Sequence, residues 1–427
     1  MPSSNPAFTP SPSTSKPPGN ELNPLPGEAP TNLFLSRRFA PLFWCQAFAA
    51  FNDNFLKTAL AVLILYRLHG QSSLVALAGA AFVGPSLFVS GISGQMADRF
   101  DKARVATRVK LVEIAAAGLA VAGFLLQSIP LLFAALLAFG ILASLFGPVK
   151  YGLLPDLLPT VTLPLANASV DFATFAAILL GTALGGLLGA REPIVLGIIV
   201  MGFALLAFGA ASLIPRPGAA QPGLRLNANP YNAGRDLITV LRTTTNLWHA
   251  ALVNTWFWFA GITCLTLLPV ITKTAFHRGP DSVTLGLTIF CIGIGAGSFL
   301  AAKLMHGAIS LKPARPGTIL VGLGALAIAS LATPAHFIAM LVVLFVISAA
   351  GGLIAVPSFA AVQAWSAPTA RARAVAGTNI TSAAAMLAAS LALTALLHEG
   401  IGARAIFAGL GILALGLGLI VPLTLRR

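Results

Sequence analysis

Long apolar runs alternate with short polar segments over most of the chain. Three of these runs, at 131–145, 194–213 and 319–331, contain no charged side chain. An α-helix needs about 20 apolar residues to cross roughly 30 Å of hydrocarbon, since each residue adds about 1.5 Å. Lipid offers no partner for free backbone groups, so such runs must form helices with closed hydrogen bonding. The pattern therefore predicts a bundle of membrane-spanning helices.

About twelve spans can be placed, six on each side of a longer polar, basic connection at 215–248. They are expected at 39–68, 74–96, 105–127, 130–154, 161–189, 193–214, 249–275, 282–306, 315–333, 335–365, 371–397 and 402–425. This layout resembles that of the major facilitator superfamily, which pairs two six-helix halves, each made of inverted three-helix repeats. We therefore expect an all-α membrane protein with halves at 38–214 and 249–427.

Composition agrees with a membrane bundle. Hydrophobic residues make up 57% of the 427 and charged residues 9%, against roughly 25% charged in soluble domains. Residues 1–37 are rich in Pro and Ser and lack an apolar core, so we expect a disordered cytoplasmic tail there. The cysteines (Cys45, Cys264 and Cys291) lie in apolar runs without metal or redox spacing. We expect no metal, no cofactor and no nucleic-acid partner.

The positions of lysine and arginine orient the spans. Of 26 such residues, three lie inside spans (Lys57, Lys110 and Lys150). With both termini in the cytoplasm, five more face outward (Arg67, Arg191, Lys273, Arg278 and Arg404) and the remaining majority faces the cytoplasm. This bias follows the positive-inside rule and predicts cytoplasmic termini.

The loop between the second and third spans runs from Gly94 to Arg104 and reads GQMADRFDKAR. It resembles the signature loop of the major facilitator superfamily, G-x-x-x-D-R-x-x-(K/R)-x-(K/R). We expect Asp98 to pair with a basic side chain or a helix end in one conformation only, and Gly94 to permit close helix approach. The alternative is a loop that serves only topology. The candidate latch is Gly94, Asp98, Arg99, Lys102 and Arg104.

The first span carries the polar sequence Asn52-Asp53-Asn54 followed by Lys57. Asp53 and Lys57 are four residues apart, so they share a helix face and could pair. A charge near mid-membrane costs about 2.5–3.5 kcal/mol, so such residues are retained for function or paired. The functional interpretation is favoured here.

Further charges lie in the third to fifth spans. Lys110 and Glu113 share a face of the third span, where function and structural pairing weigh evenly. Gly147-Pro148 is expected to break the fourth span and turn Lys150 inward. Asp171 completes a set of three acids against three lysines, all in the N-terminal half.

The seventh span supplies an apolar counterpart in four consecutive aromatic residues, Trp256, Phe257, Trp258 and Phe259. Consecutive residues face different ways on a helix, so only some can line a cavity. Lipid-facing or interfacial rings are the alternative interpretation.

These motifs together resemble the bacterial lysophospholipid transporters, and the transporter portion of their fusions with acyltransferase and acyl-acyl-carrier-protein synthetase domains. The resemblance covers roughly Phe39 to the C-terminus. It rests on N-D-N-x-x-K in the first span, G-P-x-K-Y-G in the fourth, W-F-W-F in the seventh, and GGLIAVP with Gln363 and R-x-R in the last spans. Some members carry an arginine after the aromatic group, where this chain has the uncharged Ile262–Thr266.

The resemblance implies flippase-like uptake of lysophospholipids, chiefly lysophosphatidylethanolamine, across the inner membrane for reacylation by a separate cytoplasmic enzyme. A lysine would hold the phosphate, Asp53 the ammonium, and apolar walls the acyl chain. The candidate substrate pathway is Asp53, Asn54, Lys57, Glu113, Lys150, Tyr151, Trp256 and Trp258.

The main competing function is a proton-coupled drug or small-solute transporter of the same fold. Such a transporter would use one proton-carrying acid, whereas the charges here balance. An enzyme is disfavoured because the chain has no Gly-x-Ser-x-Gly elbow. Its nearest approach to an acyltransferase His-x-x-x-x-Asp motif, 277–281, is one residue too short.

Overall fold

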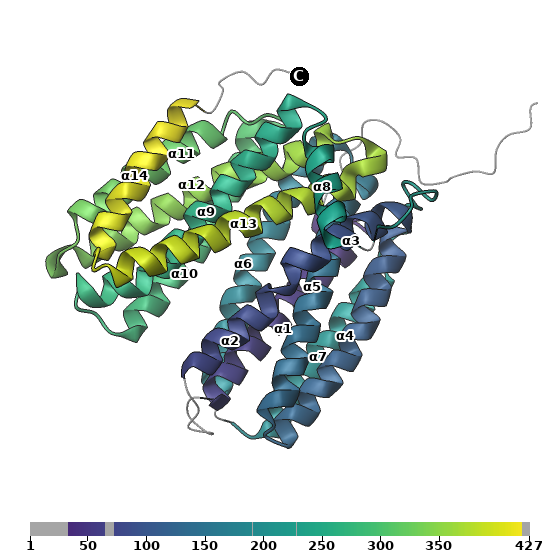
Figure 1. The fold of residues 1–427 in the computed structure, drawn as a ribbon, viewed down its shortest axis with the longest axis horizontal. Coiled ribbons are helices and arrows are strands. Elements are labelled where there is room, and N and C mark those ends of the chain that lie inside the picture. The colour runs from purple at the N-terminus through teal and green to yellow at the C-terminus, as the bar shows by residue number, and fades with distance from the viewer. Residues whose placement is uncertain (1–32, 65–71, 190, 228, 421–427) are drawn as a thin grey trace, which may run out of the picture.

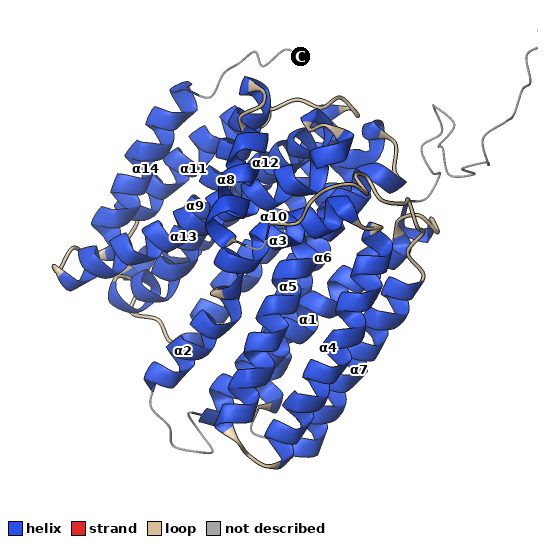
Figure 2. Cartoon of the chain, turned by 45° about the vertical axis from the view of Figure 1, so that its right-hand side comes forward, coloured by secondary structure: helices blue, strands red, loops and turns tan. Residues whose placement is uncertain are grey.

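The computed structural model describes residues 33–64, 72–189, 191–227 and 229–420, and in that part every regular element is a helix (Figures 1 and 2). The N-terminal bundle contains α1 (Ala40–Val62), α2 (Ser72–Val83), α3 (Pro85–Arg99), α4 (Lys102–Leu125), α5 (Ile129–Leu157), α6 (Leu163–Leu188) and α7 (Pro193–Ser212). The C-terminal bundle contains α9 (Thr245–Thr274), α10 (Pro280–Met305), α11 (Ala314–Ser330), α12 (Phe337–Trp365), α13 (Arg371–His398) and α14 (Ala403–Ile420). The short helix α8 (Pro230–Leu241) lies between them.

With α2 and α3 counted as one interrupted span, these helices make the predicted twelve. Among the described residues, eight helical segments are long and apolar enough to cross a membrane, and α11 and α14 are shorter apolar helices. The remaining two spans are α1 and α4, which carry the polar and charged residues singled out above. Most of the predicted tail at 1–37 lies outside the described residues, and Leu33–Leu35 form a short 3₁₀ helix.

Local sequence signals place the helix ends. The Asp101 carboxylate accepts a hydrogen bond from the Arg104 backbone N–H at 2.9 Å and so caps α4. The Thr244 hydroxyl accepts one from the Leu247 N–H at 3.3 Å and caps α9. Proline occupies the first turn of α3, α5, α6, α7, α8 and α10, where its missing N–H leaves no intrahelical bond unmade.

Two expectations about helix continuity were wrong. The fourth span does not break at Pro148, because α5 runs unbroken through Pro148 and Pro155; membrane helices tolerate proline where neighbouring groups satisfy the freed carbonyls. The second span is divided instead into α2 and α3 at Gly84, directly before Pro85, although the Gly84 backbone keeps helical dihedrals (φ −51°, ψ −44°). The polar connection also contains a helix that the sequence reading did not anticipate, the amphipathic α8.

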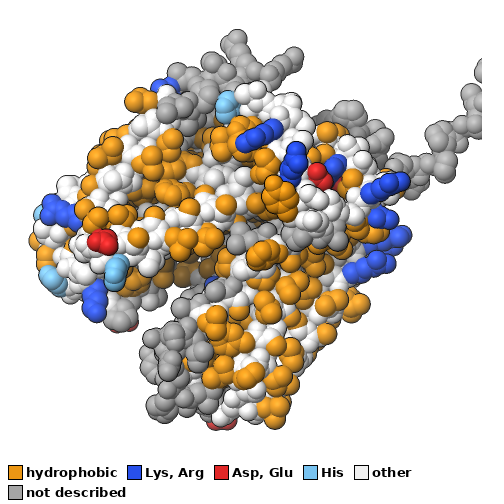
Figure 3. All heavy atoms as spheres, viewed as in Figure 1, with side chains coloured by type: hydrophobic (Ala, Val, Ile, Leu, Met, Phe, Trp, Pro, Cys, Tyr) orange, Lys and Arg blue, Asp and Glu red, His pale blue; other side chains and the backbone are white. Residues whose placement is uncertain are grey.

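The two bundles meet along one end and separate toward the other. Helix α13 packs against α3 and α5, and α6 packs against α10 and α12. The space-filling view shows a wedge-shaped cleft between the bundles (Figure 3). We call the end with α8 and the α3–α4 and α12–α13 connections the closed face, and the opposite end the open face.

Small residues bring helices of the two bundles together at the closed face. A Cβ at Gly94 on α3 would lie 2.6 Å from the Ala376 Cβ on α13, so no larger residue fits without movement. Helix α8 covers this contact. A Cβ at Gly91 on α3 would lie 3.0 Å from the Ala233 Cβ, and one at Gly377 on α13 would lie 3.0 Å from the Leu237 carbonyl oxygen. The connecting helix therefore packs on both bundles at once.

Candidate functional site

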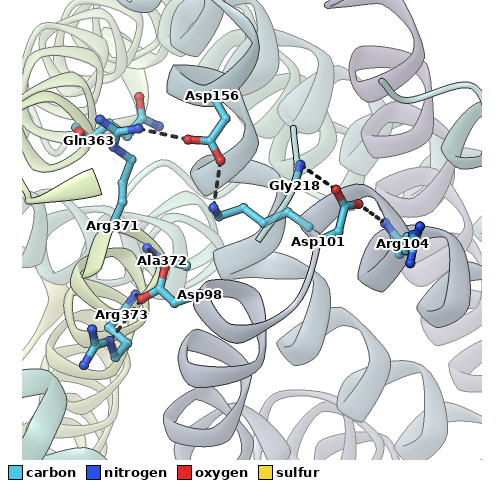
Figure 4. Close-up of polar contacts among 10 residues, drawn as sticks. Asp98, Asp101, Arg104, Asp156, Gly218, Gln363, Arg371, Ala372 and Arg373 are labelled. Atoms are coloured by element: carbon cyan, nitrogen blue, oxygen red, sulfur yellow. Dashed lines mark hydrogen bonds and ion pairs between the residues drawn. The ribbon is translucent and has the colours of Figure 1, made fainter. Parts of the chain in front are cut away.

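A carboxylate of the N-terminal bundle caps a helix of the C-terminal bundle. Asp98, at the end of α3, is fully buried and accepts hydrogen bonds from the backbone N–H groups of Ala372 (3.0 Å) and Arg373 (3.1 Å), in the first turn of α13. The Arg373 guanidinium adds a third bond at 3.0 Å (Figure 4). Free N–H groups and the helix dipole favour an anion at this end of α13.

A second acid lies beside this cap and joins three helices. The Asp156 carboxylate on α5 accepts from the Lys102 ammonium of α4 at 2.7 Å and from the Arg371 guanidinium of α13 at 2.9 Å (Figure 4). Arg371 also donates to the Gln363 carbonyl oxygen at 3.0 Å. Lys102 is fully buried, so loss of this carboxylate would leave its ammonium buried without a counter-charge.

Two further contacts between the bundles lie nearer the open face, one between α6 and α12 and one between α5 and α12. The side-chain amides of Asn167 on α6 and Gln363 on α12 exchange hydrogen bonds of 2.8 and 3.0 Å. One turn outward, the Tyr151 ring on α5 stacks on the Phe359 ring on α12, with centroids 4.4 Å apart and planes 14° apart. Ion pairs, an amide pair and an aromatic pair thus seal successive levels.

The charged residues of the first and third spans lie in the N-terminal bundle. Lys110 and Glu113 on α4 form a buried ion pair, and the Lys110 ammonium lies 4.5 Å from the Phe146 ring centroid. The half-buried Asp53 carboxylate lies within electrostatic range of that pair and of Lys57 and Lys150. A group of mixed charge therefore gathers on this bundle.

The proposed ion pair between Asp53 and Lys57 does not form in this structure. The Lys57 ammonium donates instead to the Asn54 side-chain oxygen at 3.0 Å, and none of the four ion pairs found in the described residues includes Asp53. The Asn54 amide donates to the Ala50 carbonyl at 2.8 Å, which turns its oxygen toward the lysine. Helix spacing alone did not anticipate this neutral competitor.

The four aromatic residues of the seventh span differ in how deeply they are buried. Trp256 and Phe257 on α9 are buried, whereas Trp258 and Phe259 are half-buried. Trp256 stacks on Phe259, with centroids 5.7 Å apart. Apolar residues of α9, α13 and α14, among them Phe259 and Leu393, also line a cavity of about 270 Å³. The aromatic group and this cavity therefore both lie in the C-terminal bundle.

Residues 42–308 match the family model of the Major Facilitator Superfamily. The chain belongs to this superfamily. Two solved structures share its fold: the human organic anion transporter MFSD10 (TM-score 0.75, 15% identity, 90% of this chain and 99% of that one) and, in an outward-facing state, a bacterial homologue of the iron transporter ferroportin (TM-score 0.73, 15% identity, 91% and 98%).

Similarity in sequence narrows the family. The lysophospholipid transporter LplT of Cronobacter sakazakii is 30% identical over 352 residues, which cover 79% of this chain and 82% of that protein. The lysophospholipid transporter LplT of Shigella boydii is 31% identical over 391 residues, covering 87% and 90%. The chain therefore belongs to the lysophospholipid transporter family, whose members are transporters and not enzymes.

The transporter brings together some of the predicted latch residues. Gly94, Asp98 and Lys102 lie at contacts with α13 or Asp156, as described above. Arg99 instead lies over its neighbour Phe100, 5.3 Å from the ring centroid, and the Arg104 side chain is exposed. Neither of these two arginines reaches the C-terminal bundle through an ion pair in the described residues.

The sequence analysis missed Asp156, because its partners are 54 and 215 residues away. A signal was available in its position, because an acid directly after an apolar span can pair with basic side chains at the ends of neighbouring helices. Gln221, in the connection before α8, was missed as well. Its side-chain oxygen accepts from Arg373 at 2.7 Å, and its N–H donates to the Asp98 carbonyl at 2.8 Å.

The latch geometry predicts that Asp98→Asn opens the closed face. The amide keeps the size of the carboxylate but loses the charge that holds Arg373 and the first turn of α13. We therefore expect the equilibrium between conformations to shift by about 1–3 kcal/mol toward those in which the closed face is open. Ser366→Cys, a near-isosteric change of a buried residue in this seam, would report it by maleimide labelling. Labelling should be about 5–150-fold faster in the variant.

The matched control is Asp236→Asn, which removes an exposed carboxylate from α8. The half-buried Cys291 is first replaced by serine, whereas Cys45 and Cys264 are buried and can stay. If position 366 is labelled at the same rate with and without Asp98→Asn, the loop at 94–104 serves only membrane topology.

Proposed function

We propose that this protein carries lysophospholipids, such as lysophosphatidylethanolamine, across the bacterial inner membrane from the outer to the inner leaflet. Transport proceeds by alternating access, with the cleft open first on one side and then on the other. The named activity of two relatives, matched over 82% and 90% of their own length, supports the substrate class.

The observation that carries the proposal is the asymmetry of the two bundles. A lysophospholipid has a phosphate, often an ammonium group, and one long acyl chain. Lysines such as Lys150 suit the phosphate and a carboxylate suits the ammonium, and both lie in the N-terminal bundle. The aromatic and aliphatic surface of the C-terminal bundle suits the acyl chain.

We further propose that the closed face is cytoplasmic, as are both termini. The bias of lysine and arginine toward the loops of that face supports this orientation. A cleft open to the periplasm would then receive lipid from the outer leaflet. Its product would reach a separate cytoplasmic acyltransferase or acyl-acyl-carrier-protein synthetase, which is the partner we propose.

The experiment that tests the function is uptake of labelled lysophosphatidylethanolamine into spheroplasts of cells that lack their own transporter, with and without a protonophore. Uptake that depends on this protein is the expected result. No uptake of lysophospholipid, together with protonophore-sensitive export of a drug or small solute, would favour the competing function.

Lys150→Ala should impair uptake of lysophosphatidylethanolamine and lysophosphatidylglycerol alike, because both lipids carry the phosphate. Loss of one charge-assisted hydrogen bond predicts a fall of about tenfold or more. Lys273→Ala, which removes an exposed lysine at the end of α9, is the control and should leave uptake unchanged. Undiminished uptake of both lipids in Lys150→Ala would remove this lysine from the pathway.

Asp53→Asn should lower uptake of lysophosphatidylethanolamine more than that of the amine-free lysophosphatidylglycerol, because the amide keeps the shape but loses the charge. Since Lys57 is held by Asn54, adding Lys57→Met should not restore transport. The two lipids are measured side by side in the single and double variants. Rescue by the double variant would show that Asp53 serves only to neutralise Lys57.

A further inference from the structure

Two opposite charges in the N-terminal bundle contact the same tyrosine from different sides. The Lys150 ammonium lies 4.8 Å from the centroid of the Tyr151 ring. The Tyr151 hydroxyl donates to the Asp171 carboxylate, across from α5 to α6, at 3.4 Å. Lys150 and Asp171 are within electrostatic range of each other, but among the described residues they do not form an ion pair. The tyrosine therefore contacts both charged side chains.

The Asp171 carboxylate is left with unused bonding capacity. The residue is 6% exposed, and its Oδ2 atom has no hydrogen-bond partner in the described structure. Burying a carboxylate oxygen without a hydrogen-bond donor costs more free energy than burying an unpaired neutral polar atom. Such an atom, beside a lysine that does not neutralise it, fits a site that awaits a cationic ligand.

The position of Asp171 places this unit directly above the closed seam, at the level that we call the floor of the cleft. Asp171 is one helical turn beyond Asn167, whose amide seals the seam with Gln363. Phe359, under the Tyr151 ring, is one turn before Gln363 on the oppositely directed α12. Lys150, Tyr151 and Asp171 therefore form the level next above the amide pair, on the side of the open face.

Asp53 and Asp171 lie at different depths. A hydrogen bond of 3.0 Å joins Gln46 on α1 to Thr174 on α6, and Gly181 packs against the backbone of Phe51. This register puts Asp53 level with residue 181, ten residues nearer the open face than Asp171. At about 1.5 Å of rise per residue the two acids are about 15 Å apart along the helices, so one ammonium cannot contact both.

We propose that Lys150, Tyr151 and Asp171 form a receptor for a zwitterionic phospholipid headgroup. Lys150 holds the phosphate, Asp171 Oδ2 accepts from the ammonium, and Tyr151 sets the spacing. The two charges of a phosphoethanolamine group are joined by a two-carbon chain, and a direct ion pair between Lys150 and Asp171 would leave neither charge free for them. Asp53 is then the outer station and Asp171 the inner one. This inference rests on the proposed function and adds its headgroup preference.

The test is direct binding of labelled lysophosphatidylethanolamine to the purified full-length protein in detergent, with unlabelled lysophosphatidylglycerol as competitor. Asp171→Asn should lower the affinity for the amine-bearing lipid by about tenfold or more, because a charge-assisted bond is lost. The affinity for lysophosphatidylglycerol should be kept. Glu192→Gln, which removes an exposed carboxylate between α6 and α7, is the matched control and should change neither.

Tyr151→Phe keeps the ring that carries Lys150 and packs on Phe359, but removes the hydroxyl that orients Asp171. It should weaken the preference for the amine-bearing lipid in the same direction, and it provides the test if Asp171→Asn does not fold. The affinity of Asp53→Asn for the two lipids is measured in the same assay.

Equal loss of affinity for the two lipids in Asp171→Asn and Tyr151→Phe would overturn the receptor while leaving the proposed function intact. The receptor would also be overturned if the preference for the amine-bearing lipid disappeared in Asp53→Asn but persisted in Asp171→Asn and Tyr151→Phe. An unaltered protein that binds neither lipid would instead contradict the proposed function, and the receptor with it.

Discussion

The contact on which the arrangement of the two bundles depends is the buried Asp98 carboxylate against the first turn of α13. It combines two backbone bonds, one guanidinium bond and the favourable end of a helix dipole. Both partners belong to ends of long helices, so separating them requires the bundles to move as bodies. Asp156 and its two cations sit beside this contact and reinforce it, and α8 covers it from outside. The cleft can open to one side because this seam is closed on the other.

The two bundles also differ in the side chains that they carry. Within its predicted spans the N-terminal bundle carries three acids and three lysines, of which only Lys110 and Glu113 form an ion pair in the described residues, whereas the C-terminal bundle carries the aromatic group of α9. A charged headgroup and an acyl chain need such different walls. The Tyr151–Phe359 stack joins the two bundles, and a ligand at the proposed headgroup site would contact Tyr151. Headgroup binding and closure of the seam would therefore both involve the Tyr151 side chain.

Much of the fold could be predicted from sequence, because membrane spans are long apolar runs and each run reports its own helix. The same holds for Asp98, whose loop has a recognisable spacing. Interactions between distant segments could not be predicted in this way. Asp156 pairs with residues far along the chain. The amphipathic pattern of α8 is present in residues 230–241, but the two bundles on which its apolar face packs come together only on folding. The proposed Asp53–Lys57 pair shows the limit of helix periodicity, since spacing places side chains on one face but does not choose among neighbours such as Asn54.

Alternating access driven by a single-chain phospholipid is the central claim, and spin-label distances test it most directly. One pair of labels, at Arg104 and Thr369, spans the closed face, and a second pair, at Glu192 and Glu399, spans the open face; all four side chains are exposed. Lysophosphatidylethanolamine should lengthen the first distance and shorten the second in part of the population, and diacyl phosphatidylethanolamine should not, because a ligand shifts only the states it binds differently. Distance distributions that are unchanged by saturating lysophosphatidylethanolamine would contradict the account.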